Sequence, residues 1–86
     1  MLGFMTSHEI RVIRRSLVEA GFECHVGFGN RDSVVLNVGW DFGDALRSSL
    51  DSIVFIIRRV IAEADISFLS GEEVDGCGSA SVLIRA

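Results

Sequence analysis

Apolar and polar positions along this chain follow two different periods, and the periods change in the same order twice. Apolar residues recur at steps of three and four over residues 10–20 and again over 46–64, which is the period of an amphipathic helix. Each of these stretches precedes two segments in which apolar and polar residues alternate with a period of two, as in half-buried strands. The predicted element order is therefore αββαββ.

The first half contains specific signals for its helix and its hairpin. Thr6 and Glu9 have the spacing of a capping box and Gly21 supplies a left-handed stop, so we expect a helix over about residues 7–20. The register that places the apolar residues of the next two strands on one face pairs Phe28 with Val34, Val26 with Leu36, Cys24 with Val38 and Phe22 with Trp40. We expect all eight to be buried beneath the helices, because a slip of one residue would expose half of the set.

The second half repeats this order with a longer helix. We expect that helix over about residues 44–64, with its apolar stripe against the sheet. Asp75-Gly76 is a strong signal for a two-residue hairpin turn, and it predicts strands over 66–74 and 77–85.

An internal similarity supports the interpretation that the chain is duplicated. Residues 10–20, IRVIRRSLVEA, match residues 54–64, VFIIRRVIAEA, at five positions that include both arginines of each Arg-Arg pair. In each copy a predicted hairpin follows the helix. We therefore divide the chain into repeat halves of about residues 6–40 and 44–86.

The predicted fold is α+β in a single domain of residues 1–86. We expect a two-layer sandwich in which two helices cover one face of a four-stranded, mostly antiparallel sheet. Moving the last strand to the front gives βαββαβ, so the arrangement is similar to a permuted ferredoxin-like fold with a pseudo-twofold repeat. By that analogy the second and fourth strands are central and parallel. Residues 34–36 and 82–84 are the most continuously apolar strand segments, which agrees with a central position.

Composition narrows the possible functions. The net charge is −4, which is not the basic footprint of a direct nucleic-acid binder. The longest apolar run, 53–57, is too short to span a membrane, and residues 1–5 do not resemble a signal peptide, so we expect a cytoplasmic protein. Cys24 and Cys77 lack the spacing of a zinc or redox motif, and we expect no metal and no cofactor.

One candidate polar site lies on the sheet face away from the helices. Glu23, His25 and Asn37 share that face in the predicted register, and His25 lies opposite Asn37. A histidine beside a carboxylate and an amide can carry out acid–base chemistry. A solvated histidine on an edge strand is the commoner explanation of the same pattern.

Candidate interaction residues are apolar positions that the pattern leaves exposed. Phe55 lies opposite the buried stripe of the second helix. If Phe68 and Leu83 face the helices, Leu69, Val82 and Ile84 lie on the outer sheet face. The set of candidate interaction residues is Phe55, Leu69, Val82 and Ile84.

These features favour a non-catalytic protein-interaction module over an enzyme. The apolar fraction of 49% is high for a domain this small, so we expect part of the apolar surface to meet a protein partner or a second copy in a homodimer. The alternative is an acidic, phage-type inhibitor that docks on a basic nucleic-acid-handling partner through Glu72, Glu73 and Asp75. A third hypothesis is a small enzyme or ligand-binding domain that uses His25.

Overall fold

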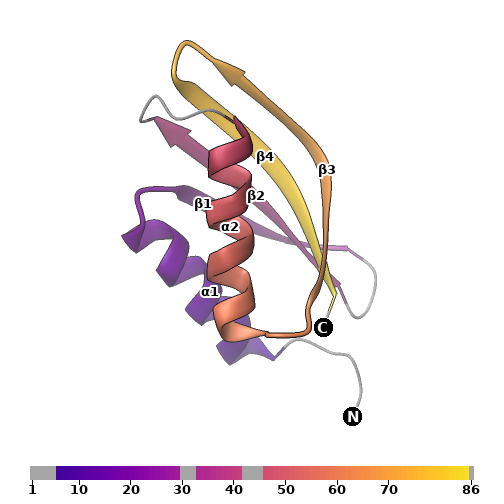
Figure 1. The fold of residues 1–86 in the computed structure, drawn as a ribbon. Helices are drawn as coiled ribbons and strands as arrows, with labels where there is room; N and C mark the ends of the chain where they lie inside the picture. Colours follow the sequence, from indigo (N-terminus) through magenta and orange to yellow (C-terminus); the bar gives the residue numbers. More distant parts are fainter. Residues whose placement is uncertain (1–5, 30–32, 42–45, 86) are drawn as a thin grey trace.

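The helices and strands follow the predicted αββαββ order. The computed structural model describes residues 6–29, 33–41 and 46–85. The elements are α1 (Ser7–Glu19), β1 (Glu23–Phe28), β2 (Ser33–Asp41), α2 (Leu46–Val60), β3 (Asp65–Val74) and β4 (Cys77–Arg85). Both helices lie on the same face of one four-stranded sheet (Figure 1), which confirms the two-layer α+β fold.

Helix α1 begins and ends as its sequence predicts. Thr6 Oγ1 accepts a hydrogen bond from the Glu9 amide (3.1 Å), and Glu9 Oε1 accepts one from the Thr6 amide (2.9 Å). This reciprocal pair satisfies two amides that have no partner within the helix. Gly21 follows the C-cap with a φ of +98°, the left-handed conformation that glycine adopts without steric cost.

The first hairpin has the predicted register. Cys24 pairs with Val38 and Val26 with Leu36, so His25 lies opposite Asn37. Phe22 precedes β1 and packs edge-on against Trp40, with ring centroids 6.2 Å apart. The expected burial of Phe28 is wrong, since its side chain is 79% exposed, and Val26 is only partly buried. Phe28 is the last residue of β1, where the hairpin extends past both helices (Figure 1).

The strand order is also as predicted, but the central pair runs antiparallel. The order across the sheet is β1-β2-β4-β3, with β2 and β4 in the middle. Both β2 and β3 pair antiparallel with β4, so the expectation of parallel central strands is wrong. The crossover through α2 makes β3 parallel to β2, and the tight hairpin then reverses the chain into β4. The ferredoxin-like permutation and the duplication stay predictions.

Helix α2 ends earlier than the sequence pattern suggests. It stops at Val60 rather than near residue 64, while predicted positions 44 and 45 lie outside the described residues. The Ile61 amide still donates to the Ile57 carbonyl, but the Ala64 amide donates to the Ile61 carbonyl (3.2 Å). This tighter turn replaces the last helical turn and leads the chain into β3.

The β3–β4 hairpin closes through Asp75 and Gly76, as predicted. Both have positive φ, +51° and +83°, as the favoured two-residue hairpin turns require. The pairing then shifts between Phe68 and Ser70, where Leu69 is the extra residue of a β-bulge. β3 is an edge strand, and most of its residues are exposed.

The core lies between the helices and the inner sheet face, and it includes two residues that the sequence analysis placed outside. Val82 and Ile84 are 0% exposed. They pair with Leu36 and Val34, which also face the helices, so their expected position on the outer face is wrong. Leu83 faces outward instead, because successive residues of a strand point to opposite faces.

The Trp40 ring packs against Gly78 of β4, which has no side chain. The two residues pair in the sheet register, and a Cβ atom added at Gly78 would overlap the indole ring. Trp40 is buried, and its ring covers the glycine backbone at this end of the sheet.

Candidate functional site

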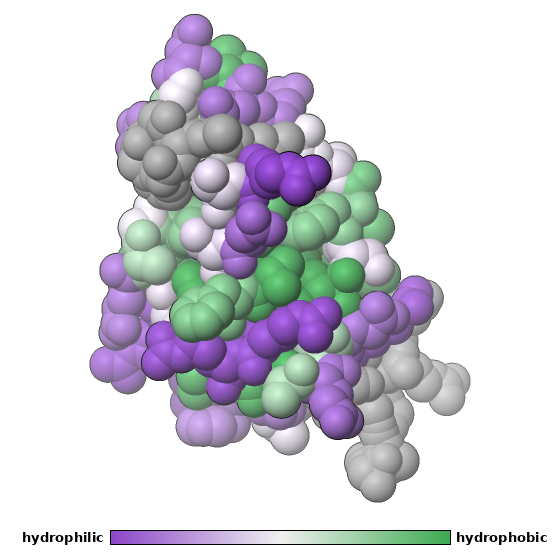
Figure 2. Space-filling view, in the orientation of Figure 1, coloured by the Kyte–Doolittle hydropathy of each residue, from purple (hydrophilic) through white to green (hydrophobic). Residues whose placement is uncertain are grey.

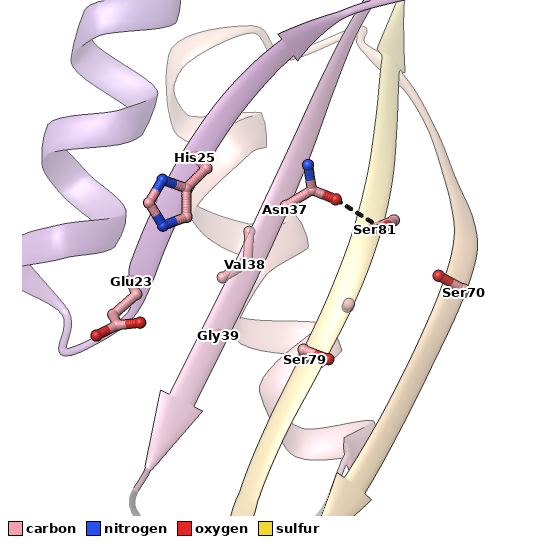
Figure 3. Close-up of a pocket in the computed structure, with 9 residues that line it drawn as sticks. Glu23, His25, Asn37, Val38, Gly39, Ser70, Ser79 and Ser81 are labelled. Atoms are coloured by element: carbon pink, nitrogen blue, oxygen red, sulfur yellow. Dashed lines mark hydrogen bonds between the residues drawn. The ribbon is translucent and has the colours of Figure 1, made fainter.

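The outer face of the sheet carries a row of polar side chains across all four strands. His25, Asn37, Ser81 and Ser70 are successive partners in the sheet register. With Glu23 they border an open hollow of about 280 Å³ (Figure 3). The structure therefore brings together the three predicted residues Glu23, His25 and Asn37.

Hydrogen bonding within this hollow is partial. Ser81 Oγ donates to Asn37 Oδ1 (2.8 Å), which leaves the Asn37 amide nitrogen as a donor toward the open face. In the part of the chain that the structure describes, neither Glu23 nor His25 makes a side-chain hydrogen bond or an ion pair. A buried or oriented imidazole is the usual sign of an acid–base residue, and His25 has neither property here. The hollow offers hydrogen bonds to a polar ligand.

Ser70, Ser79 and Ser81 are members of this hollow that the sequence analysis missed. They lie on β4, whose residues were assigned to the wrong faces, and on β3, where the bulge at Leu69 turns Ser70 outward. The alternation of Ser79 and Ser81 with buried Ala80 and Val82 was the available signal. Within residues 6–29, 33–41 and 46–85, no group of three His, Cys, Asp or Glu side chains is arranged to hold a metal ion.

The two cysteines differ in environment. Cys24 is buried, and burial raises the pKa of its thiol, while the Arg14 guanidinium acts in the opposite direction. Cys77 is exposed on β4, and its thiol donates a hydrogen bond to Asp41 Oδ1 (2.9 Å). That hydrogen bond favours the protonated thiol and raises the pKa of Cys77, with further contributions from desolvation and from the Asp41 charge.

Replacing Asp41 by asparagine should make Cys77 more reactive. The substitution removes the carboxylate charge, so the pKa of Cys77 should fall and more thiolate should be present at a given pH. The rate of iodoacetamide alkylation, followed by peptide mass spectrometry across pH, should rise at lower pH than in the wild type. Buried Cys24 serves as the internal control, and an unchanged Cys77 profile would contradict the assigned hydrogen bond.

The exposed side of α2 is the second candidate site. Phe55 is 65% exposed, which confirms the outward position expected for it. Toward α1 it borders a hollow of about 420 Å³ lined by Ala20, Ser52 and Ile56. Toward β3, a hollow of about 410 Å³ is lined by Arg47, Leu50 and Phe68. Asp51 borders both hollows.

The helix side of the molecule carries exposed apolar surface. Figure 2 shows hydrophobic side chains over the helix layer, flanked by strongly hydrophilic ones. Phe68 and Leu69 of β3 are 42% and 56% exposed, so Leu69 is accessible as expected. Val82 and Ile84 contribute nothing to any surface, because both are buried.

We found no family model, curated protein or solved structure that matches this chain. Geometry and chemistry are therefore the basis for any functional assignment. Neither α1 nor α2, the helices of the described segments, is long and apolar enough to cross a membrane.

Proposed function

We propose that this protein is a non-catalytic interaction module that self-associates through the exposed side of α2. The observation that carries the proposal is the exposed side chain of Phe55, which borders an open hollow toward α1, while a second hollow lies toward β3 beside Leu50 and Phe68. A phenylalanine ring left in water forgoes about 2 kcal/mol of burial free energy. A domain of this size has roughly 5 kcal/mol of net stability, so covering the ring is a substantial gain.

The helix side replaces the outer sheet face as the proposed association surface. The sheet face depended on Val82 and Ile84, and both are in the core. The centre of that face consists instead of Glu23, His25, Asn37 and serine hydroxyls (Figure 3). Such a surface is well hydrated and gains little from being covered by an apolar partner.

Replacing Phe55 by alanine should weaken self-association at least tenfold, because each copy loses its exposed ring and about 1.4 kcal/mol corresponds to a factor of ten. Light scattering and sedimentation over a range of concentrations measure the dissociation constant. Phe28→Ala is the control, since the Phe28 ring is even more exposed than that of Phe55 but lies at the end of β1. Wild-type protein that remains monomeric at high concentration, or an equal effect of both substitutions, would overturn the proposal.

The acidic-inhibitor hypothesis is a second proposal that the hairpin geometry favours. Glu72, Glu73 and Asp75 are all exposed near the β3–β4 turn, which projects beyond the helix layer (Figure 1). An acidic tip of this kind suits a basic partner. The enzyme hypothesis has less support, because His25 is exposed and has no orienting partner among the described residues.

A further inference from the structure

Four residues on the exposed side of α2 form a regular charge pattern. Arg47, Asp51, Phe55 and Arg59 are spaced by four, so they lie along one side of the helix, and we call them the α2 stripe. Its members are basic, acidic, aromatic and basic in order.

This pattern is complementary to itself when two copies of α2 run antiparallel. Residues of α2 equally distant from Phe55 then meet across the pair, so that Asp51 faces Arg59 of the second copy. A parallel arrangement would instead oppose Asp51 to Asp51 and Arg59 to Arg59. Like charges in direct opposition disfavour association, so the charge order selects the antiparallel pair.

No member of the stripe is ion-paired in the described part of the chain, and Arg59 lies over the Phe55 ring in a cation–π contact. In the described segments the ion pairs are Arg15 with Glu19 and Arg85 with Asp65. The Arg59 guanidinium lies 5.9 Å from the centroid of the Phe55 ring, which places it beside the centre of the stripe. Asp51 is exposed, and its carboxylate makes no ion pair with another described residue of the same chain.

In the antiparallel arrangement the ring of a second copy rests on the open hollow toward α1. This hollow lies directly beside Phe55 and is lined by Ala20, Ser52 and Ile56. In an antiparallel pair, each Phe55 lies next to the hollow of the other copy, so both rings are covered by one contact. A standard interface buries about 800 Å² of solvent-accessible surface on each partner. That is about one seventh of the 5383 Å² of accessible surface of this chain.

We infer that the occupant of this surface is a second copy of the chain, docked with α2 antiparallel to α2 about a twofold axis through Phe55. The inference rests on the proposed function, and it adds the partner, the direction of packing and the residue pairs. A twofold contact of this kind gives a closed dimer, because the α2 stripe of each copy is buried against the α2 stripe of the other and no further copy can add there.

Two charge reversals test the arrangement. Asp51→Arg alone would oppose arginines at both pairs, and Arg59→Asp alone would oppose aspartates, so each variant should dissociate at least tenfold more readily than the wild type. When the two variants are mixed, both pairs become complementary in the heterodimer. The mixture should therefore associate to within a few-fold of the wild-type dissociation constant.

Arg58→Asp is the matched control for the charge change. Arg58 is exposed in the same turn of α2 but lies outside the stripe, so its reversal should leave the dissociation constant within a few-fold of the wild type. Circular dichroism of each variant shows whether it is folded. Association restored only in the mixture supports the inference.

Two other outcomes are distinguishable. If the wild type associates and Phe55→Ala prevents it, but the mixture of charge variants does not recover, the antiparallel arrangement is wrong and the interaction module stands. If Phe55→Ala leaves association unchanged, or the wild type does not associate, the proposed function fails and the inference fails with it.

Discussion

Replacing Ile57 by alanine should lower the free energy of unfolding by about 2–5 kcal/mol, the range for removing a buried aliphatic side chain. Ile57 is 0% exposed and belongs to the core between α2 and the sheet. The loss has two parts, the lost transfer free energy of the deleted carbons and the cavity that they leave. In a domain with a net stability of roughly 5 kcal/mol, such a variant approaches the unfolding threshold.

Arg58→Ala is the matched control for this prediction. This substitution introduces an alanine at the next position of the same helix. Because Arg58 is exposed, the substitution should change the free energy of unfolding by less than about 0.5 kcal/mol. Urea unfolding, followed by the fluorescence of the single tryptophan at low protein concentration, measures both values. Equal effects of the two substitutions would contradict the assigned orientation of α2.

Replacing Gly78 by alanine should cost about 1–3 kcal/mol of unfolding free energy, the usual penalty for overpacking a core. The new Cβ would overlap the Trp40 ring, which is buried and flanked by Phe22. The ring cannot move without disturbing its edge-on contact with Phe22. Gly78 has no positive φ, so the expected cost is steric and not a matter of backbone conformation.

Gly39→Ala provides the comparison for Gly78→Ala. Gly39 pairs with Ser79 in the same sheet, and the nearest atom to an added Cβ there is the Gly78 carbonyl oxygen at 3.7 Å, an ordinary contact. This variant should be neutral or slightly stabilising, because alanine has less backbone entropy to lose than glycine. Adding Trp40→Phe to Gly78→Ala should show positive coupling in a double-mutant cycle followed by circular dichroism, because Trp40 is the single tryptophan. Absence of coupling would mean that the ring is not the obstacle.

The first half of the chain was predictable because, apart from Val35, the apolar residues of its strands lie on one face. In β1 and β2 the inward positions include Cys24, Leu36 and Val38, while His25 and Asn37 alternate with them. One register satisfies this pattern, and the structure has it. The polar candidates were predicted together for the same reason, since the register that buries the apolar set also aligns the polar one.

The second half was less predictable because β4 is apolar on both faces near its end. Val82 and Ile84 alternate with Leu83, so hydrophobicity alone does not decide which of them points inward. The β2–β4 pairing and the β-bulge in β3 decide it, and both depend on contacts between residues far apart in the sequence. The outward position of Phe55 could be predicted, because the helical period assigns each residue to one side of the helix.

The β-bulge at Leu69 has a consequence for how copies of this protein can accumulate. A long, regular edge strand is a template on which further strands add, and unchecked addition leads to fibres. In β3 the bulge breaks the repeat of unpaired backbone groups, and Glu72 and Glu73 place two negative charges further along the same edge. Sheet extension at β3 is therefore disfavoured, and a crowded solution of this protein should resist growth into cross-β fibrils that start from this edge.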